Sequence, residues 1–323
     1  MTFTLGEVKE NGQYCEDYAL VKSCQVGYTR NKDPFLTIVL ANKEKEVEAK
    51  LWASEFPFGY EPKELQEMWK GGTIVKFTGE TNVFRDKLQL KLTTIDAVSE
   101  DKVNIENLIP TAPISLQQLE EETYRMVEEI QDPTLQRITM DLFNKFHDRF
   151  FRFPAAKKHH HAYVGGLAYH TLSMAKLATS IASMYPVIDK DVLLSGTLLH
   201  DMGKCIELSG AFDTTYTTEG NMIGHITLMV MEVDRIVQSL KEEKEIDEEK
   251  VVQLIHLIQS HHGKMEYGSP KEPMTLEAAV LHQVDMIDSS VEMYKETLKD
   301  MEEGEVEFSH PIGQVYKPFQ YHH

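Results

Sequence analysis

The C-terminal half of the chain contains seven side chains that could bind metal ions. Imidazole and carboxylate groups are ligands of divalent cations, and an adjacent His-Asp pair offers both kinds from one helical turn. Such a series, spread along the chain, is typical of metal-dependent hydrolases. The candidate ligands are His170, His200, Asp201, His225, His261, His262 and Asp285.

Predicted helices position the first three of these ligands. His170 lies on the apolar face of a helix, near its beginning, and points toward the core. The helix from Asp191 to about His200 delivers the His-Asp pair at its C-terminal end. Gly203 then lets the chain turn away, and Lys204 projects a cation beside the proposed centre.

The remaining ligands follow in later helices. One helix opens at His225, and another, capped by Asp247, ends its apolar stripe at His261 and His262. Asp285 lies in a further helix, predicted over 275–303. A single histidine on an apolar face is more often a hydrogen-bonded core residue. Two histidines that continue one stripe need buried partners, and a metal would satisfy both.

Length, composition and charge limit the classes of protein to which this chain can belong. A chain of 323 residues with 41% hydrophobic content suggests about two domains with real cores. Residues 1–98 carry 13 Lys+Arg and 15 Asp+Glu, net −2, whereas residues 99–323 carry 20 and 37, net −17. The total of −19 argues against one broad basic surface for nucleic acid, but a local basic groove or metal-mediated phosphate binding stays open.

The cysteines and the hydropathy pattern indicate a cytoplasmic chain with no membrane partner. Three scattered cysteines are too few for a disulfide framework or a cysteine zinc site. We find neither a signal-peptide pattern nor an apolar run near the roughly 20 residues that span a bilayer.

The N-terminal region has the alternation of β-branched, aromatic and polar residues that predicts strands. Five strands, with a short helix over 62–69 between the third and fourth, fit a small barrel. The order of strands resembles the OB-fold, which commonly binds single-stranded nucleic acid on aromatic platforms. Core packing is the alternative explanation for each aromatic residue. The predicted strands are Ala19–Val26, Phe35–Leu40, Glu46–Trp52, Thr73–Thr81 and Lys87–Ala97, and the candidate nucleic-acid contacts are Phe35, Trp52, Phe84 and Arg85.

These patterns predict a multidomain α+β protein. The OB-fold barrel occupies residues 1–100, and a proline-containing linker spans 101–114. An all-α domain follows over 115–303, with helices that start at Ser115 and at Asp132-Pro133. Residues 304–323, which contain Pro311, Gly313 and Pro318, are expected to be an irregular tail.

The ordered pattern H…HD-x-G-K…GH…HHG…D resembles the HD-domain phosphohydrolases, an all-helical metal-dependent superfamily. The resemblance implies that His170, His200, Asp201 and Asp285 bind one metal. Members similar to the HD-GYP phosphodiesterases hold a second metal, which implies ligation by His225, His261 and His262. The GYP sequence itself is absent here, so the resemblance does not extend to cyclic dinucleotides.

A barrel of this kind joined to an HD domain is the arrangement of the YhaM family of bacterial 3′-to-5′ exoribonucleases. The segment His160-His161-Ala-Tyr-Val-Gly-Gly-Leu, followed by His170, is an especially close match. The resemblance covers essentially the whole chain. It implies manganese-supported release of nucleoside 5′-monophosphates from single-stranded RNA, with single-stranded DNA as a secondary substrate.

A mechanism of this class assigns roles to three further groups. In a two-metal site, ions about 3.5–4 Å apart stabilise the attacking and leaving oxygens, and Asp201 would bridge them. Lys204 would neutralise phosphate charge in the transition state. His160 or His161 would contact the substrate phosphate or protonate the leaving oxygen, with a structural role as the alternative.

Two other functions stay open at this point. One is an HD nucleotidase or cyclic-nucleotide phosphodiesterase, in which the barrel serves assembly or regulation. The other is a non-catalytic single-strand-binding protein associated with replication. The mixed ligand set allows Mn, Fe, Co, Ni or Zn, and the sequence leaves open whether the chain forms a homo-oligomer.

Overall fold

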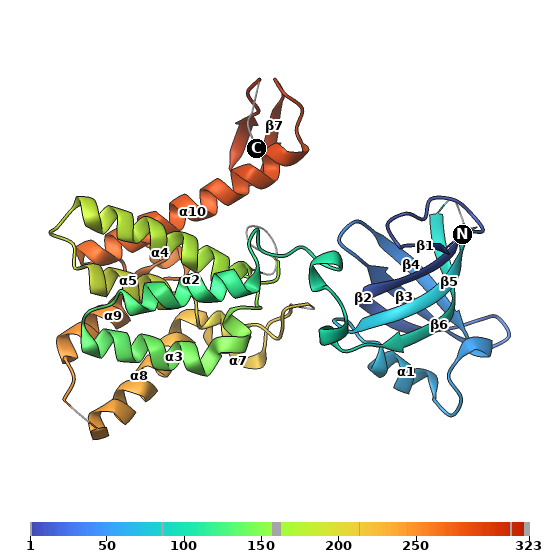
Figure 1. The fold of residues 1–323 in the computed structure, drawn as a ribbon, viewed down its shortest axis with the longest axis horizontal. Coiled ribbons are helices and arrows are strands. Elements are labelled where there is room, and N and C mark those ends of the chain that lie inside the picture. The colour runs from blue at the N-terminus through green and yellow to red at the C-terminus, as the bar shows by residue number, and fades with distance from the viewer. Residues whose placement is uncertain are drawn as a thin grey trace. The chain divides into compact units, whose positions relative to one another are not determined.

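Five long strands close into a barrel in the N-terminal part of the protein. The computed structural model describes residues 2–84, 87–156, 163–212, 214–243, 245–310 and 312–319. The barrel strands run antiparallel except where β4 pairs with β6, and β2 pairs with β5 to close the barrel (Figure 1). A two-residue strand, β1, adds to β2 in parallel. The strands are β1 (Thr2–Phe3), β2 (Tyr14–Tyr28), β3 (Pro34–Ala41), β4 (Glu46–Trp52), β5 (Ile74–Phe84) and β6 (Lys87–Ala97).

This strand order is that of an OB-fold, so the predicted fold class is confirmed for the first domain. Strands β4 and β6 have the predicted bounds, whereas β2 is much longer than predicted. Its first half pairs with β5 and its second half with β3, with a register shift between Val21 and Ser23. The two halves thus have different partners, which the local alternation pattern does not reveal.

The barrel core is filled by side chains that alternate inward along these strands. Leu36, Ile38, Leu90 and Phe77 are fully buried. Helix α1 (Pro62–Met68) lies between β4 and β5, as predicted, and begins with a capping box formed by Glu61 and Glu64. Short 3₁₀ turns, η1 (Ala53–Glu55), η2 (Glu100–Lys102) and η3 (Ile105–Asn107), complete this part of the chain.

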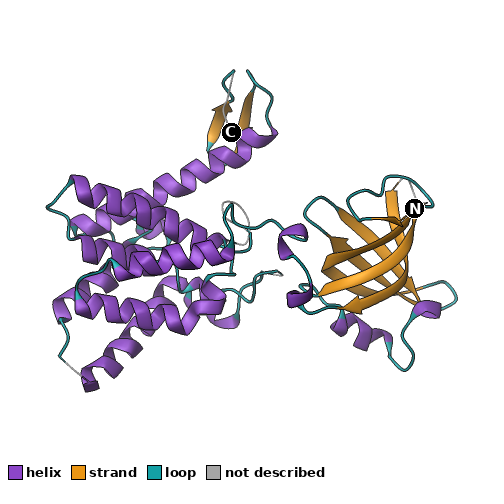
Figure 2. Cartoon of the chain, viewed as in Figure 1, coloured by secondary structure: helices purple, strands orange, loops and turns teal. Residues whose placement is uncertain are grey.

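The second unit is helical and spans residues 112–323, while the first spans 1–111. The boundary falls inside the predicted linker, and two 3₁₀ turns occupy part of that linker. Figure 2 shows helices throughout the second unit except for one small hairpin. The helices are α2 (Leu116–Glu128), α3 (Pro133–Phe150), α4 (Gly166–Met184), α5 (Lys190–Leu199), α6 (Lys204–Glu207), α7 (Thr218–Ile223), α8 (His225–Glu243), α9 (Glu248–Ser260), η4 (Met265–Tyr267) and α10 (Leu276–Asp300).

Side-chain caps start these helices where the sequence predicts. Ser115 accepts a hydrogen bond from the Gln118 backbone, Asp132 from the Leu135 backbone, and Asp247 from the Lys250 backbone. Helix α5 is almost entirely buried, and it packs against α4, α9 and α10. A buried central helix therefore delivers the His-Asp pair into the interior of the bundle.

The prediction that residues 304–323 form an irregular tail is wrong. Strands β7 (Val306–Ser309) and β8 (Gly313–Tyr316) form an antiparallel hairpin. Val315 is buried with Leu298 and Met301 at the end of α10, so the hairpin has its own small apolar cluster. The prediction treated the glycine as a break, whereas Gly313 adopts φ 94° at the first residue of β8. Among the described helices, none has the length and apolar character needed to cross a bilayer.

Candidate metal centre

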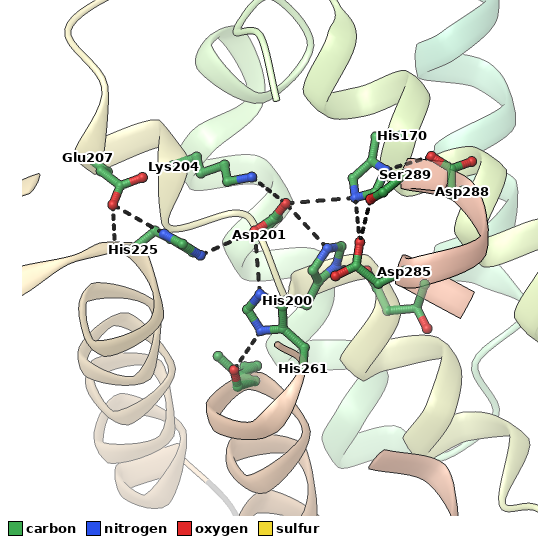
Figure 3. Close-up of polar contacts among 12 residues, drawn as sticks. His170, His200, Asp201, Lys204, Glu207, His225, His261, Asp285, Asp288 and Ser289 are labelled. Atoms are coloured by element: carbon green, nitrogen blue, oxygen red, sulfur yellow. Dashed lines mark hydrogen bonds and ion pairs between the residues drawn. The ribbon is translucent and has the colours of Figure 1, made fainter. Parts of the chain in front are cut away.

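Asp201 lies in the middle of the candidate centre, in the turn after α5. Its Oδ2 atom is 2.7 Å from the Lys204 ammonium and 3.3 Å from His200 Nε2. Its Oδ1 atom is 3.4 Å from His225 Nε2 and 3.7 Å from His261 Nε2. Figure 3 shows these side chains converging on one carboxylate from separate helices.

The two oxygens of Asp201 face two groups of candidate ligands. On the Oδ2 side, His170 Nε2 lies 3.8 Å from Asp201 and 3.5 Å from Asp285 Oδ1. On the Oδ1 side lie the histidines of α8 and of the turn after α9. A carboxylate with a group on each oxygen is what a bridging ligand requires. Sets with donor atoms within 4.8 Å of one another are His225, His261 and His262; His170, His200 and Asp201; and His200, His261 and Asp285.

All five histidines of the centre have their Nδ1 atoms occupied by an acceptor. Three of these acceptors are backbone carbonyls, which only accept, so Nδ1 carries the hydrogen and Nε2 presents a lone pair. For the other two histidines, His170 and His225, a carboxylate accepts the hydrogen bond from Nδ1. This arrangement is the one found around metal-bound histidines. The acceptors are Asp288 for His170, Thr197 O for His200, Glu207 for His225, Ile258 O for His261 and Tyr267 O for His262, at 2.7–3.1 Å.

The inward-facing atoms of the centre lack hydrogen-bond partners among the described residues. These atoms are buried, and a buried polar atom without a partner is costly. Bound cations would satisfy them together, so the residues present fit a divalent-metal site. The atoms are His200 Nε2, Asp201 Oδ1, His225 Nε2 and His261 Nε2.

Electrostatics keep three of the donors, Asp201, His261 and His262, in the state that a metal requires. Burial alone would raise the pKa of Asp201, but the charges of Lys204 and His200 outweigh it and hold the pKa well below its usual value. Burial lowers the pKa of His261 strongly and that of His262 in the same direction. Although burial opposes it, the adjacent Asp201 raises the pKa of His200, so a metal would compete with a proton there.

The turn between α5 and α6 needs a glycine because its backbone closely approaches that of the first residue of α8. A Cβ atom on Gly203 would lie 2.1 Å from the His225 backbone oxygen. The neighbouring Lys204 is largely buried and bonded to Asp201. Burial would lower the pKa of Lys204, but Asp201 outweighs it and raises the pKa, so the lysine stays charged.

The structure adds one supporting carboxylate that sequence reasoning missed. Glu207, at the end of α6, accepts from both the Nδ1 and the backbone N–H of His225, each at 3.1 Å. The pair is formed by the turn of α6 toward α8, and no spacing rule predicts it. A second carboxylate, Asp288, lies three residues after Asp285 on α10 and bonds His170 Nδ1 at 2.7 Å.

All seven predicted metal ligands therefore lie in one cluster. His170, His200, Asp201 and His261 are buried, and His225, His262 and Asp285 are partly exposed. Three of the ligands are therefore partly exposed as whole residues, although the Nε2 atom of His225 is itself buried. His161, the predicted contact for the substrate phosphate, lies outside the described residues, as does Arg85 of the barrel.

The three described aromatic candidates of the barrel line one groove. Its volume is about 330 Å³, and Phe35, Trp52, Phe84, Lys50 and Lys91 contribute to it. The Phe35 and Trp52 ring centroids are 5.2 Å apart, and the Lys50 ammonium lies 5.3 Å from the Phe35 centroid. Trp52 is 36% exposed and Phe84 54% exposed, whereas Phe77 is fully buried. Core packing thus accounts for Phe77 but not for Trp52 and Phe84.

The fold and the centre together define an HD-domain protein with an OB-fold barrel at its N-terminus. The family model described as HD domain matches residues 167–290, which contain all seven candidate ligands. A model described as a putative helicase matches residues 117–190, which include only His170 of that set.

The relatives narrow this class to one family. The chain is 43% identical over 298 residues to a protein of Listeria welshimeri and, equally, to one of Bacillus subtilis, each named 3′-5′ exoribonuclease YhaM. The matches cover 92% of this chain and 91% of each relative. The chain belongs to the YhaM family, and the predicted recognition and the predicted hydrolase class are confirmed.

Among solved structures, the barrel is similar to the second OB-fold domain of replication protein A from Methanococcus maripaludis. The match has 14% identity and a TM-score of 0.23, and it covers 31% of this chain and 97% of that one.

Proposed function

We propose that this protein is a metal-dependent 3′-to-5′ exoribonuclease that releases nucleoside 5′-monophosphates from single-stranded RNA. Single-stranded DNA is proposed as a second substrate. One observation carries the proposal: five imidazoles, each with Nδ1 held by an acceptor, cluster with Asp201 and Asp285. Membership of a family whose relatives are named for this activity supports it.

The donor set is suited to two divalent ions, and manganese is proposed as the native metal. Asp201 would be shared between the ions. The bound ions would supply electrostatic stabilisation to the attacking and leaving oxygens of phosphodiester hydrolysis. The proposed ligands are His170, His200, Asp201 and Asp285 for one ion, and Asp201, His225, His261 and His262 for the other.

The chain's own cations act beside these ligands. Lys204 holds the Asp201 carboxylate at 2.7 Å, which keeps it ionised and oriented. Its permanent charge beside the reacting phosphate would stabilise negative charge that grows during the reaction, with no proton transfer. His161 is proposed to contact that phosphate or to protonate the leaving oxygen.

The barrel groove is proposed to hold the single strand upstream of the cleaved end. Exposed Trp52 and Phe84 offer stacking surfaces to any base, and Lys50 and Lys91 offer charges to the backbone. Sequence-tolerant binding of this kind suits an enzyme that removes every nucleotide in turn. Arg85 is proposed to add a further phosphate contact.

Two further features of the proposed enzyme concern its state in the cell. Exposed Ile287, Val291 and Tyr294 on α10 support a homo-oligomer. The buried, free thiols of Cys15, Cys24 and Cys205 and the RNA substrate support a cytoplasmic enzyme.

The test is an assay with end-labelled single-stranded RNA and, in parallel, a panel of free and cyclic nucleotides. With Mn²⁺ we expect a ladder that shortens from the 3′ end and monophosphate products, and no activity after EDTA treatment. Turnover of free or cyclic nucleotides alone would reject the proposal in favour of a nucleotidase or cyclic-nucleotide phosphodiesterase. Unchanged RNA degradation by Asp201→Ala would point to a contaminating nuclease.

A further inference from the structure

A short turn beside the centre carries an exposed aromatic ring and an exposed cation. The turn follows His261 and His262 and contains η4. Tyr267 is 59% exposed, and the Lys264 ammonium lies 5.6 Å from its ring centroid. Neither the metal ligands nor the barrel groove accounts for this pair.

Backbone hydrogen bonds hold the turn in a fixed shape. The Tyr267 N–H donates to Lys264 O at 3.0 Å, and the Gly268 N–H donates to Met265 O at 3.0 Å. Before the turn, His282 Nδ1 donates to His261 O at 2.9 Å. The ring of Tyr267 therefore projects from an ordered backbone and needs little further ordering to accept a ligand.

The same turn is tied directly to a candidate metal ligand. His262 Nδ1 donates to the Tyr267 carbonyl oxygen at 2.9 Å, so one residue orients the imidazole and carries the exposed ring. His262 is also one of the partly exposed ligands. The aromatic ring and the ammonium thus belong to the short turn that orients a partly exposed candidate ligand.

Lys264 is available to a phosphate. Its one ion pair among the described residues is with Glu266 at 3.5 Å, and both side chains are largely exposed. Exposed pairs of this kind contribute little stability and exchange partners readily. A stacking ring next to such a cation is the combination that single-strand-binding proteins use, one for the base and the other for the backbone.

We propose that Tyr267 and Lys264 form the subsite for the 3′-terminal nucleotide of the RNA. Tyr267 stacks on the terminal base, and Lys264 pairs with a phosphate beside the centre. Since every base has an aromatic face, one ring serves all four nucleotides. This inference rests on the proposed exoribonuclease function and adds the position at which the terminal nucleotide is seated.

The first test uses RNA that carries the fluorescent base 2-aminopurine at its 3′ end and a hydrolysis-resistant phosphorothioate at the terminal linkage. We expect wild-type protein with Mn²⁺ to quench this fluorescence, Tyr267→Phe to retain the quenching and Tyr267→Ala to lose it. An RNA with 2-aminopurine at its 5′ end serves as the substrate control and should not distinguish Tyr267→Ala from wild type.

Steady-state kinetics on unmodified RNA provide the second readout. Tyr267→Ala should raise KM about tenfold, within the range for loss of one base-stacking residue. The matched control is Tyr185→Ala, because Tyr185 is 58% exposed and ends α4 about 20 Å from His170 along the helix. Lys264→Gln should lower the slope of log KM against log salt by about 0.7, the value for one phosphate contact on a single strand.

Three outcomes overturn the inference while leaving the proposed function intact. They are unchanged quenching and KM in Tyr267→Ala, an equal loss in Tyr185→Ala, and a fall in bound manganese that parallels the loss of activity. The last outcome would mean that Tyr267 acts only by orienting His262 and does not contact the terminal base. If wild-type protein releases no monophosphate from RNA, the proposed function itself fails.

Discussion

The candidate metal centre and the barrel groove differ in how their side chains are held. In the centre, Asp201 is 4% exposed and is surrounded by groups whose orientations are fixed by further hydrogen bonds. In the groove, Trp52 and Phe84 are 36% and 54% exposed. Buried polar groups with fixed orientations are suited to catalysis, because a reaction requires defined distances between the reacting atoms. Exposed aromatic rings are suited to binding, because a base can stack on them in more than one position and any base can do so.

The comparison predicts two kinds of mutant. Changes in the centre should lower the metal content of the protein or lower kcat. The loss of kcat should be seen on every substrate, because the same reacting groups act on each. Changes in the groove should raise KM on long strands only, because a mononucleotide substrate has no further bases to stack there.

Asp201→Asn should have the largest effect. The substitution keeps the shape of the side chain but removes the charge that both groups of ligands share. We expect activity to fall by more than about a hundredfold, beyond the range for losing a group that only orients a ligand. Metal analysis should show loss of both ions, and circular dichroism should show a folded protein. A folded variant with full metal content and full activity would show that Asp201 is neither a required metal ligand nor required for hydrolysis.

Gly203→Ala should disturb one half of the centre. The added Cβ would lie 2.1 Å from the His225 backbone oxygen, so the start of α8 must move. Bound manganese should fall from two ions toward one per chain, with a large loss of kcat. The control is Gly210→Ala, because a Cβ atom there meets nothing within 4 Å. Equal effects of the two substitutions would show that the close approach is unimportant.

Glu207→Ala should lower activity or metal affinity about 10- to 100-fold, the usual range for a residue that orients a metal-bound histidine. Glu207 contacts His225 and has no place among the proposed ligands. Glu207→Gln keeps an acceptor and should lose less. The control is Glu219→Ala, an exposed carboxylate on α7. An effect of Glu207→Ala no larger than that of the control would leave His225 oriented by other contacts.

The same carboxylate predicts a pH dependence of stability. Burial would raise the pKa of Glu207, but the hydrogen bond from His225 outweighs it and lowers the pKa below 4.5. A carboxyl with a lowered folded-state pKa stabilises the fold above its usual pKa, and the contribution is lost as pH falls through the lowered value. Thermal unfolding of wild type and Glu207→Gln should therefore differ at pH 6 and converge in strong acid.

Trp52→Ala should have the smallest effect and a different character. We expect KM for single-stranded RNA to rise about tenfold, with kcat unchanged. Hydrolysis of a mononucleotide ester that is too short for the groove should be unaffected. Phe58→Ala is the matched control, since Phe58 is fully exposed and lies outside the groove residues. A fall in kcat on the short substrate would contradict the separation between groove and centre.

Prediction from sequence succeeded where local chemistry decides the structure. Strands β4 and β6 have the predicted bounds, because alternation of apolar and polar residues reports directly on a half-buried strand. Asp247 caps α9 as predicted, because a cap depends on residues three apart. The C-terminal hairpin was missed because the apolar cluster that holds it includes residues of α10.

The candidate centre shows the same limit. The order and residue types of the seven ligands, and the family resemblance that rests on them, can be identified from the sequence. The acceptor that orients each imidazole cannot be identified in that way. His170 bonds a carboxylate 118 residues away, and His225 bonds one that the turn of α6 brings close. Partners so distant in sequence have no common periodicity, so only the packed helices identify them.

The residue types alone indicate the class of chemistry, because imidazole and carboxylate groups are ligands of divalent metals. The change from strand patterns to helix patterns likewise indicates two kinds of domain. Packing in three dimensions was needed to show that the two oxygens of Asp201 face different ligand groups and that Tyr267 O accepts a hydrogen bond from His262. Such relations depend on the directions of side chains from separate helices, and those directions are fixed only when the core packs.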